Sequence, residues 1–217
     1  MSWIEFLFRH QNEVITHTLE HLFLVGISTG IAILVGIPLG ILCTRDRFWN
    51  QIILGVANMC QTIPSLALFG FLIPIPIVGG IGAKTAIIAL VLYALLPVIR
   101  NTYTGITSVD PAIAEAGRGM GMTDRQLLFQ VEIPLALSFI LAGVRVATVT
   151  SVGVATIAAA IGAGGLGSFI FAGVSMVNDR LILLGAIPAA AIALVIDLSL
   201  GAIERRLAST TGRKKEV

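Results

Sequence analysis

Two opposite charges, Arg145 and Asp197, stand alone in long apolar runs of the sequence. No other charged residue occurs from 133 to 178 or from 181 to 203. Arg145 lies near the beginning of its run and Asp197 lies seven residues before Glu204, so a helical rise of about 1.5 Å per residue puts both at a similar depth. We predict a structural ion pair between them. A proton relay is the alternative chemistry, but it requires more than two charged groups.

Several enzyme classes are excluded because their residue patterns are missing. No Gly-x-x-x-x-Gly-Lys-Ser/Thr phosphate loop occurs, so we do not expect this chain to bind or hydrolyse ATP. No Ser-His-Asp set or carboxylate pair suggests a hydrolase. His17 and His21 would share a helix face but lack a third ligand, and Cys43 and Cys60 lack a ligand cluster. We therefore predict no metal site and no cofactor.

Composition predicts a membrane protein. Apolar residues make up 56% of the 217 residues and charged residues 12%, about half the share of charge in a typical soluble domain. Since one membrane crossing needs about 20 apolar residues, the chain has room for five or six crossings and no ordinary soluble domain. The expected partner is the lipid bilayer, not nucleic acid.

The charge-free runs predict one all-α transmembrane domain over residues 1–217. Five spans are expected, at about 20–43, 51–74, 82–104, 133–160 and 181–204, with a polar loop at 110–132. Prolines and glycines interrupt the second run and the stretch after 160, because both residue types end helices. A sixth, re-entrant segment around 167–177 remains open.

Basic residues predict the orientation, because Lys and Arg near span ends are retained on the cytoplasmic side. An arrangement with the N-terminus outside and the C-terminus inside gives the inner side the larger basic set. That set is Arg45, Arg47, Arg100, Arg118, Arg125, Arg205, Arg206, Arg213, Lys214 and Lys215, against Arg9, Lys84 and Arg180 outside. The first twenty residues lack a signal-peptide pattern and predict an amphipathic lead-in at the membrane surface, or else a flexible tail.

The polar loop predicts two short helices joined at glycines. Asp110 before Pro111 is a strong helix start. Glycines from 117 to 121 should end that helix. Thr123 with Gln126 three residues later forms a capping-box pattern that should start the second helix. A helix-turn-helix of this kind can fit the groove of a partner protein.

The loop also resembles the EAA loop of bacterial ABC importer permeases. The residues that carry this resemblance are Glu115, Ala116, Gly117, Gly121, Val131, Ile133 and Pro134. Three positions depart from the family pattern while keeping small or apolar character: Gly117 replaces the second alanine, Val131 an isoleucine and Ile133 a leucine. The resemblance implies that the loop couples the chain to a separate ATPase. The implied coupling residues are Glu115, Ala116, Gly117, Arg118, Gly121, Met122 and Thr123.

Two further segments, 61–67 and 161–167, resemble permeases of the glycine betaine, carnitine and choline branch. This implies the type I ABC importer (MetI-like) fold in the bacterial cytoplasmic membrane, as a multi-pass chain that forms half of a pore. The implied partners are ABC ATPase subunits, a second permease chain and an extracytoplasmic substrate-binding protein. The alternatives are a permease for another small amine, amino acid or sulfur-containing solute, or a self-contained secondary transporter or channel.

The same segments suggest a translocation path with a gate. Pro64 leaves a carbonyl that lipid cannot satisfy, and the neutral dipoles around it suit a zwitterion or quaternary amine. For Pro64 the alternative is a packing kink, and for the glycine segment it is a tight external turn. The residues predicted for the path or gate are Gln61, Thr62, Pro64, Ser65, Gly162, Gly164 and Gly165.

Overall fold

The protein is an elongated bundle of helices. The computed structural model describes residues 3–76 and 78–210, which contain helices and turns but no strand, so the all-α prediction is confirmed. The α-helices are α1 (Trp3–Arg45), α2 (Arg47–Thr62), α3 (Ser65–Leu72), α4 (Ala83–Thr107), α5 (Pro111–Gly119), α6 (Asp124–Leu127), α7 (Ile133–Ala158), α8 (Gly167–Ser175) and α9 (Asp179–Thr210). A π-helical turn, Leu128–Glu132, joins α6 to α7, and a 3₁₀ turn, Ala159–Ile161, follows α7.

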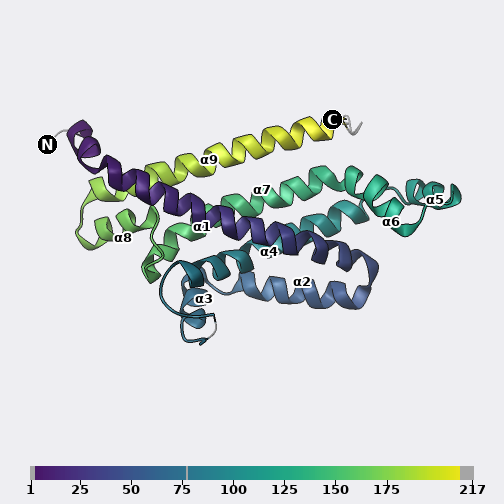
Figure 1. Ribbon diagram of the computed structural model, residues 1–217, viewed down its shortest axis with the longest axis horizontal. Coiled ribbons are helices and arrows are strands. Elements are labelled where there is room, and N and C mark those ends of the chain that lie inside the picture. Colours follow the sequence, from purple (N-terminus) through teal and green to yellow (C-terminus); the bar gives the residue numbers. More distant parts are fainter. Residues whose placement is uncertain (1–2, 77, 211–217) are drawn as a thin grey trace.

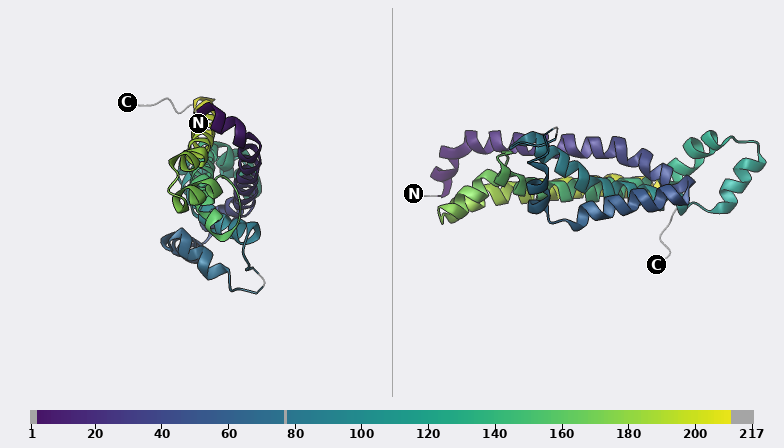
Figure 2. Two further views of the ribbon diagram at one scale, coloured as in Figure 1. Left: turned by 90° about the vertical axis from the view of Figure 1, so that its left-hand side faces the viewer. Right: turned by 90° about the horizontal axis from the view of Figure 1, so that it is seen from below.

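Helices α1, α4, α7 and α9 run along the long axis of the bundle (Figure 1). The start of α1 lies at one end, and the end of α9 and the α5–α6 loop lie toward the other (Figure 2). Among the described residues, four helices are long and apolar enough to cross a membrane, with a fifth crossing if the bent pair α2–α3 counts as one. The four are Phe8–Arg45, Ala83–Thr107, Asp124–Ile161 and Asp179–Leu207.

The span expected at 51–74 is sharply bent, and whether it crosses as one span stays a prediction. Helices α2 and α3 meet at an angle of 104°. Ile63 at the break is extended, with φ −73° and ψ 126°, because the ring of Pro64 disfavours a helical conformation in the residue before it. The chain therefore turns sharply here instead of continuing along the axis of α2.

The N-terminal lead-in is not a separate element. Helix α1 is one helix of 43 residues, about 65 Å long and about twice the thickness of a bilayer core. No proline or glycine occurs between Trp3 and Gly26 to interrupt it. Its first turns pack on the far end of the bundle, where Phe6 clusters with Phe169 and Leu184. Helix α8, in the stretch suggested as re-entrant, has nine residues and is too short to cross alone.

Helix α4 is the centre of the bundle, with α1 on one side and α7 on another. The contact with α1 is close at Gly40, where a Cβ atom would lie 2.6 Å from Cβ of Thr102 and 2.9 Å from the carbonyl oxygen of Ile99. Small residues allow such approach between helices in a membrane, where apolar burial against lipid gives little drive to associate.

We predict that Gly40→Leu destabilises the protein by about 1–3 kcal/mol, because the added side chain must displace the backbone of α4. The measurement is the thermal unfolding midpoint of the purified protein in detergent. Gly26→Leu is the control on the same helix, since no atom lies within 4 Å of a Cβ at that position. Equal midpoints for the two variants would contradict the proposed close contact.

Candidate functional site

The loop between α4 and α7 stands beyond the end of the bundle (Figure 2). Its first helix begins as predicted: the carboxylate of Asp110 accepts a hydrogen bond from the Ala112 N–H at 2.9 Å, and Pro111 is the first helical residue. Helix α5 then ends at Gly119. Local side-chain chemistry alone thus fixes where this helix starts.

The turn after α5 depends on Gly121, which has a φ of +84°. The Met122 N–H donates to the Gly117 carbonyl at 3.1 Å and closes the turn. The predicted capping box follows: the Thr123 N–H donates to Oε1 of Gln126 at 2.8 Å, and the Gln126 N–H donates to Oγ1 of Thr123 at 3.3 Å. Because a left-handed backbone disfavours residues with a Cβ, glycine is the favoured residue at 121.

Gly117 holds the two arms of the loop together. It is the buried residue of α5, and a Cβ there would lie 2.9 Å from Cδ1 of Leu127 and 3.2 Å from Sδ of Met122. Leu127 is fully buried. Gly117, which replaces the second alanine of the EAA pattern, therefore lies at a position where the smallest residue fits best.

The expected helix-turn-helix is present, but its second helix does not end before the next span. Helix α6, the π-helical turn and α7 form one continuous helical segment, Asp124–Ile161. The Ile133 N–H donates to the Leu128 carbonyl, the π-type spacing, directly before Pro134. A π turn absorbs a missing backbone donor without ending the helix. The loop is therefore mechanically continuous with α7.

The outward side of the loop offers apolar and charged groups to a partner. Ile113 is 44% exposed and Met120 is 78% exposed. Glu115 is exposed and has no hydrogen-bond or ion-pair partner within the described residues. Arg118 lies 3.9 Å from Asp124 across the turn, a weak contact between exposed groups. The other predicted coupling residues, Ala116, Gly121, Met122 and Thr123, lie on the same loop.

Where the loop joins the bundle, Arg45 ties it to α1. Nη2 of Arg45 donates to Oε2 of Glu132 at 2.9 Å, and Glu132 is largely buried. Removing either partner would leave a charge without its counter-ion at the base of the loop.

At the α2–α3 break, two backbone carbonyls without a helical donor are satisfied by a reciprocal pair of residues. Pro97 has no N–H, so the Tyr93 carbonyl in α4 lacks its helical donor. Nε2 of Gln61 donates to that carbonyl at 3.0 Å. The Tyr93 hydroxyl donates to the Ile63 carbonyl, beside Pro64. Gln61 is therefore needed for the backbone of α4 as well as for the break.

Of the residues predicted for the path, only Gln61 borders the open groove beside α4. This groove of about 430 Å³ is lined by Gln61, Tyr93, Leu96, Pro97, Arg100, Asn101, Val146 and Thr150. Thr62 donates to the Met59 carbonyl within its own helix at 2.8 Å. Pro64 and Ser65 lie at the bend, outside the residues that line the groove. The groove runs between α2, α4 and α7.

The predicted glycine segment lies elsewhere, against α1. The Gly165 N–H donates to Oε2 of Glu20 at 2.8 Å, and Nδ1 of His17 lies 2.8 Å from the same oxygen. Gly162, Gly164 and Gly165 all have positive φ, and a Cβ at Gly164 would lie 2.6 Å from the Glu20 carboxylate. The two segments predicted for the path and gate therefore form two separate places in the fold.

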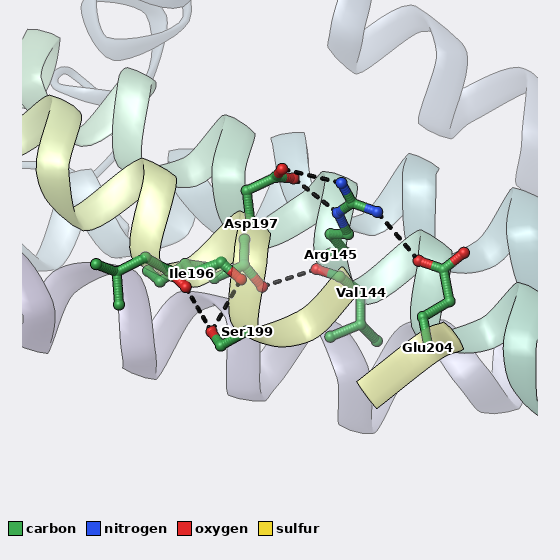
Figure 3. A network of polar contacts seen from close by, with 8 residues as sticks. Val144, Arg145, Ile196, Asp197, Ser199 and Glu204 are labelled. Carbon is green, nitrogen blue, oxygen red and sulfur yellow. Dashed lines mark hydrogen bonds and ion pairs between the residues drawn. The ribbon is translucent and has the colours of Figure 1, made fainter. Parts of the chain in front are cut away.

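Arg145 and Asp197 are in contact, and Glu204 joins them. Nε and Nη2 of Arg145 donate to the two carboxylate oxygens of Asp197 at 2.7 and 2.9 Å, and Nη1 donates to Glu204 at 3.3 Å. Figure 3 shows the guanidinium between the two carboxylates. Gly201 makes room for it, since a Cβ there would lie 3.0 Å from Nη1. The network joins α7 to α9, and its role in assembly stays a prediction.

Comparison with known proteins decides the family. The family described as "Binding-protein-dependent transport system inner membrane component" matches residues 36–209. The chain belongs to this family. The permease is 45% identical, over 94% of its length and 92% of the relative's, to the carnitine transport permease protein OpuCB of Listeria monocytogenes.

Two more relatives have similar names. The permease is 44% identical to the osmoprotectant import permease protein OsmW of Salmonella typhimurium, over 91% of its length and 93% of the relative's. It is 48% identical to the glycine betaine/carnitine/choline transport system permease protein OpuCD of Bacillus subtilis, over 84% of its length and 79% of the relative's.

Solved structures agree on the fold. A chain of the MetNI methionine ABC transporter superposes with a TM-score of 0.80 at 22% identity, covering 89% of the permease and 96% of that chain. A chain of an amino acid ABC transporter with histidines gives a TM-score of 0.79 at 20% identity, covering 95% and 99%. At these identities the likeness shows the fold alone.

The sequence did not predict the contacts of three residues at these sites: Glu204 with Arg145, Tyr93 with Ile63, and Glu20 with Gly165. Glu204 was expected only to mark the end of a span, Tyr93 had no expected role, and Glu20 was expected near a surface lead-in. Tyr93 carried a usable signal, because Pro97 four residues later frees its carbonyl. The contacts of Glu20 with Gly165 and of Glu204 with Arg145 are long-range, and no local spacing indicates them.

We predict that Asp197→Asn lowers the amount and the thermal stability of assembled permease, because it leaves Arg145 with one carboxylate in an apolar bundle. The measurement is permease recovered from membranes and its unfolding midpoint in detergent. Asp179→Asn, at the exposed start of the same helix, is the matched control. Normal assembly of Asp197→Asn with altered solute preference would show that the network serves transport instead.

Proposed function

We propose that the permease forms half of the transmembrane pore of an ATP-driven importer for compatible solutes such as glycine betaine, carnitine or choline. The observation that carries this proposal is the α5–α6 loop, which projects beyond the bundle (Figure 2) with exposed apolar and charged groups at its tip. A projecting helical loop with a fixed turn suits the groove of a partner protein. For a member of this family, the expected partner is an ABC ATPase subunit.

The proposed orientation has the N-terminus outside and the loop and C-terminus in the cytoplasm. The distribution of basic residues favours this orientation. The C-terminal ends of α1, α4 and α9 lie toward the same end of the bundle as the loop (Figure 1). Arg213, Lys214 and Lys215, part of the predicted inner set, lie outside the described residues. We place the protein in the bacterial cytoplasmic membrane with five crossings, one of them the bent pair α2–α3.

Coupling follows from continuity between the loop and α7. Since the segment Asp124–Ile161 is one helical rod, displacement of the loop by a closing ATPase must move α7, and α7 forms one wall of the groove beside α4. Arg45–Glu132 transmits the same motion to α1. Rigid-body movement of packed helices of this kind is a common switching mode.

The groove needs a second permease chain to become a path. It is open on one side and polar residues line it, so contact with lipid would leave charges and amides without partners. A similar chain placed over this face would enclose a pore between two copies of the groove. We propose that the hydrogen bond between Gly165 and Glu20, which joins the glycine segment to α1, is an outer latch that opens during transport.

The solute class rests on the relatives, whose names specify carnitine, osmoprotectants, or glycine betaine, carnitine and choline. A quaternary ammonium ion is usually captured by an aromatic cage, and the sequence has two Trp and two Tyr. Initial capture is therefore assigned to an extracytoplasmic binding protein. A different small amine, amino acid or sulfur-containing solute is the alternative that a substrate screen of that protein would reveal.

We predict that Gly121→Val reduces copurification of the cognate ATPase and ATP-dependent solute uptake, because the left-handed turn is lost at a cost of about 1–2 kcal/mol. Gly119→Val is the matched control: its surroundings are equally open, but its φ is not positive. The measurements are pull-down from membranes and uptake into proteoliposomes with ATPase and binding protein.

Two results would contradict the proposed function. One is wild-type permease that never copurifies with an ATPase. The other is solute transport by this chain alone in liposomes, which would make it a self-contained transporter.

A further inference from the structure

Arg100 is an exposed residue within α4 and not at the end of that helix, where the basic-residue pattern predicts it. It is seven residues before the end of α4 at Thr107, about 10 Å along the helix. Its neighbour Asn101 packs on Gly143 of α7, where a Cβ would lie 2.6 Å from Cβ of Asn101. Arg100 is therefore level with the part of α7 that carries Arg145.

The two arginines at this level differ in their partners. Arg145 is neutralised by two carboxylates. Arg100 donates from Nη2 to Oδ1 of Asn58 at 2.9 Å, and within residues 3–76 and 78–210 it forms no ion pair with a carboxylate. An amide orients a guanidinium but does not balance its charge. A guanidinium at this depth needs an anion or water in front of it.

The groove in front of Arg100 has the size and lining of a small-solute site. Its volume is about 430 Å³, within the range of about 300–1,000 Å³ for ligand pockets. Gln61, Asn101 and Thr150 add neutral polar groups, and Tyr93, Leu96 and Pro97 add apolar surface. No Asp or Glu lines it, so its charge complements the anionic end of a solute and not the cationic end.

The face of α7 between the arginines continues this surface. Val146 and Thr150 line both the groove of Arg100 and a second groove of about 290 Å³ beside Arg145, Asp197 and Glu204. In that second groove the carboxylates are already engaged by Arg145. Of the two arginines, Arg100 is therefore the one without a carboxylate partner among the described residues, and it can bind an incoming anion.

We propose that Arg100 is a carboxylate-binding residue of the translocation path, which holds the carboxylate of a zwitterionic solute as it passes between α2, α4 and α7. Guanidinium and carboxylate form strong, oriented hydrogen bonds, and Asn58 fixes the direction in which the guanidinium points. The proposal rests on the proposed function. It adds a specificity: glycine betaine and carnitine carry a carboxylate, whereas choline carries a neutral hydroxyl in its place.

The test compares glycine betaine with choline in proteoliposomes that contain the ATPase and saturating binding protein. Arg100→Gln is expected to lower the maximal uptake rate of glycine betaine by about tenfold or more, as the loss of a charge-assisted hydrogen bond predicts, while choline uptake stays near wild type. Arg100→Lys should retain part of the betaine rate. Arg180→Gln, at the other end of the bundle, controls for loss of one positive charge.

A second measurement needs no binding protein. In Thr150→Cys permease with Cys43 and Cys60 replaced, millimolar glycine betaine should slow labelling by a water-soluble maleimide, choline should not, and Arg100→Gln should remove the protection.

Three results overturn the proposal: equal loss of betaine and choline uptake, no loss of either, or dissociation of the permease–ATPase complex by Arg100→Gln. The last would mean that the counter-ion of Arg100 belongs to another protein chain. Wild-type permease that carries neither solute would instead refute the proposed function, so the two failures are distinguishable.

Discussion

A lipid bilayer supplies no partner for a charge or a free backbone carbonyl, and this constraint shapes the interior of the permease. Several polar groups in the bundle are matched by a group on another helix. Arg145 in α7 has two carboxylates on α9. The Ile63 carbonyl at the break and the Tyr93 carbonyl freed by Pro97 accept hydrogen bonds from Tyr93 and Gln61, respectively. These polar contacts join α2 to α4 and α7 to α9, and they fix the helices relative to one another.

The same constraint separates the faces of the bundle. The outer face of α1 carries exposed apolar residues at helical spacing, including Ile27, Ile31 and Leu34, and suits lipid. The groove between α2, α4 and α7 carries Arg100, Asn101 and Gln61 and does not. Since α7 is continuous with the second arm of the α5–α6 loop, the helix that meets the proposed ATPase contact also forms a wall of the proposed path. Coupling then needs no relay of side chains over a long distance.

Sequence reasoning succeeded where the cause of a structure is local. The start of α5 at Asp110 and the capping box at Thr123 depend on residues within three positions, and both were predictable. The sharp bend before Pro64 was harder, since a proline in a membrane helix can kink it or break it, and packing decides which. The continuity of α6 with α7 was not predictable, because a π turn and a helix end share the same proline signal. The pairing of Arg145 with Asp197 was predictable because both are isolated charges at a similar depth. Glu204 and Glu20, which contact Arg145 and Gly165 from 59 and 145 residues away, had no such signal.

The central claim is that the α2–α4–α7 face meets water while the outer face of α1 meets lipid. The most direct measurement is labelling of single cysteines by a charged, water-soluble methanethiosulfonate in the assembled transporter, with Cys43 and Cys60 replaced. Val146→Cys and Leu34→Cys are compared, because their side chains are 52% and 76% exposed in the single chain. We predict that Val146→Cys reacts and Leu34→Cys does not. Reaction of Leu34→Cys with an inert Val146→Cys would contradict the account.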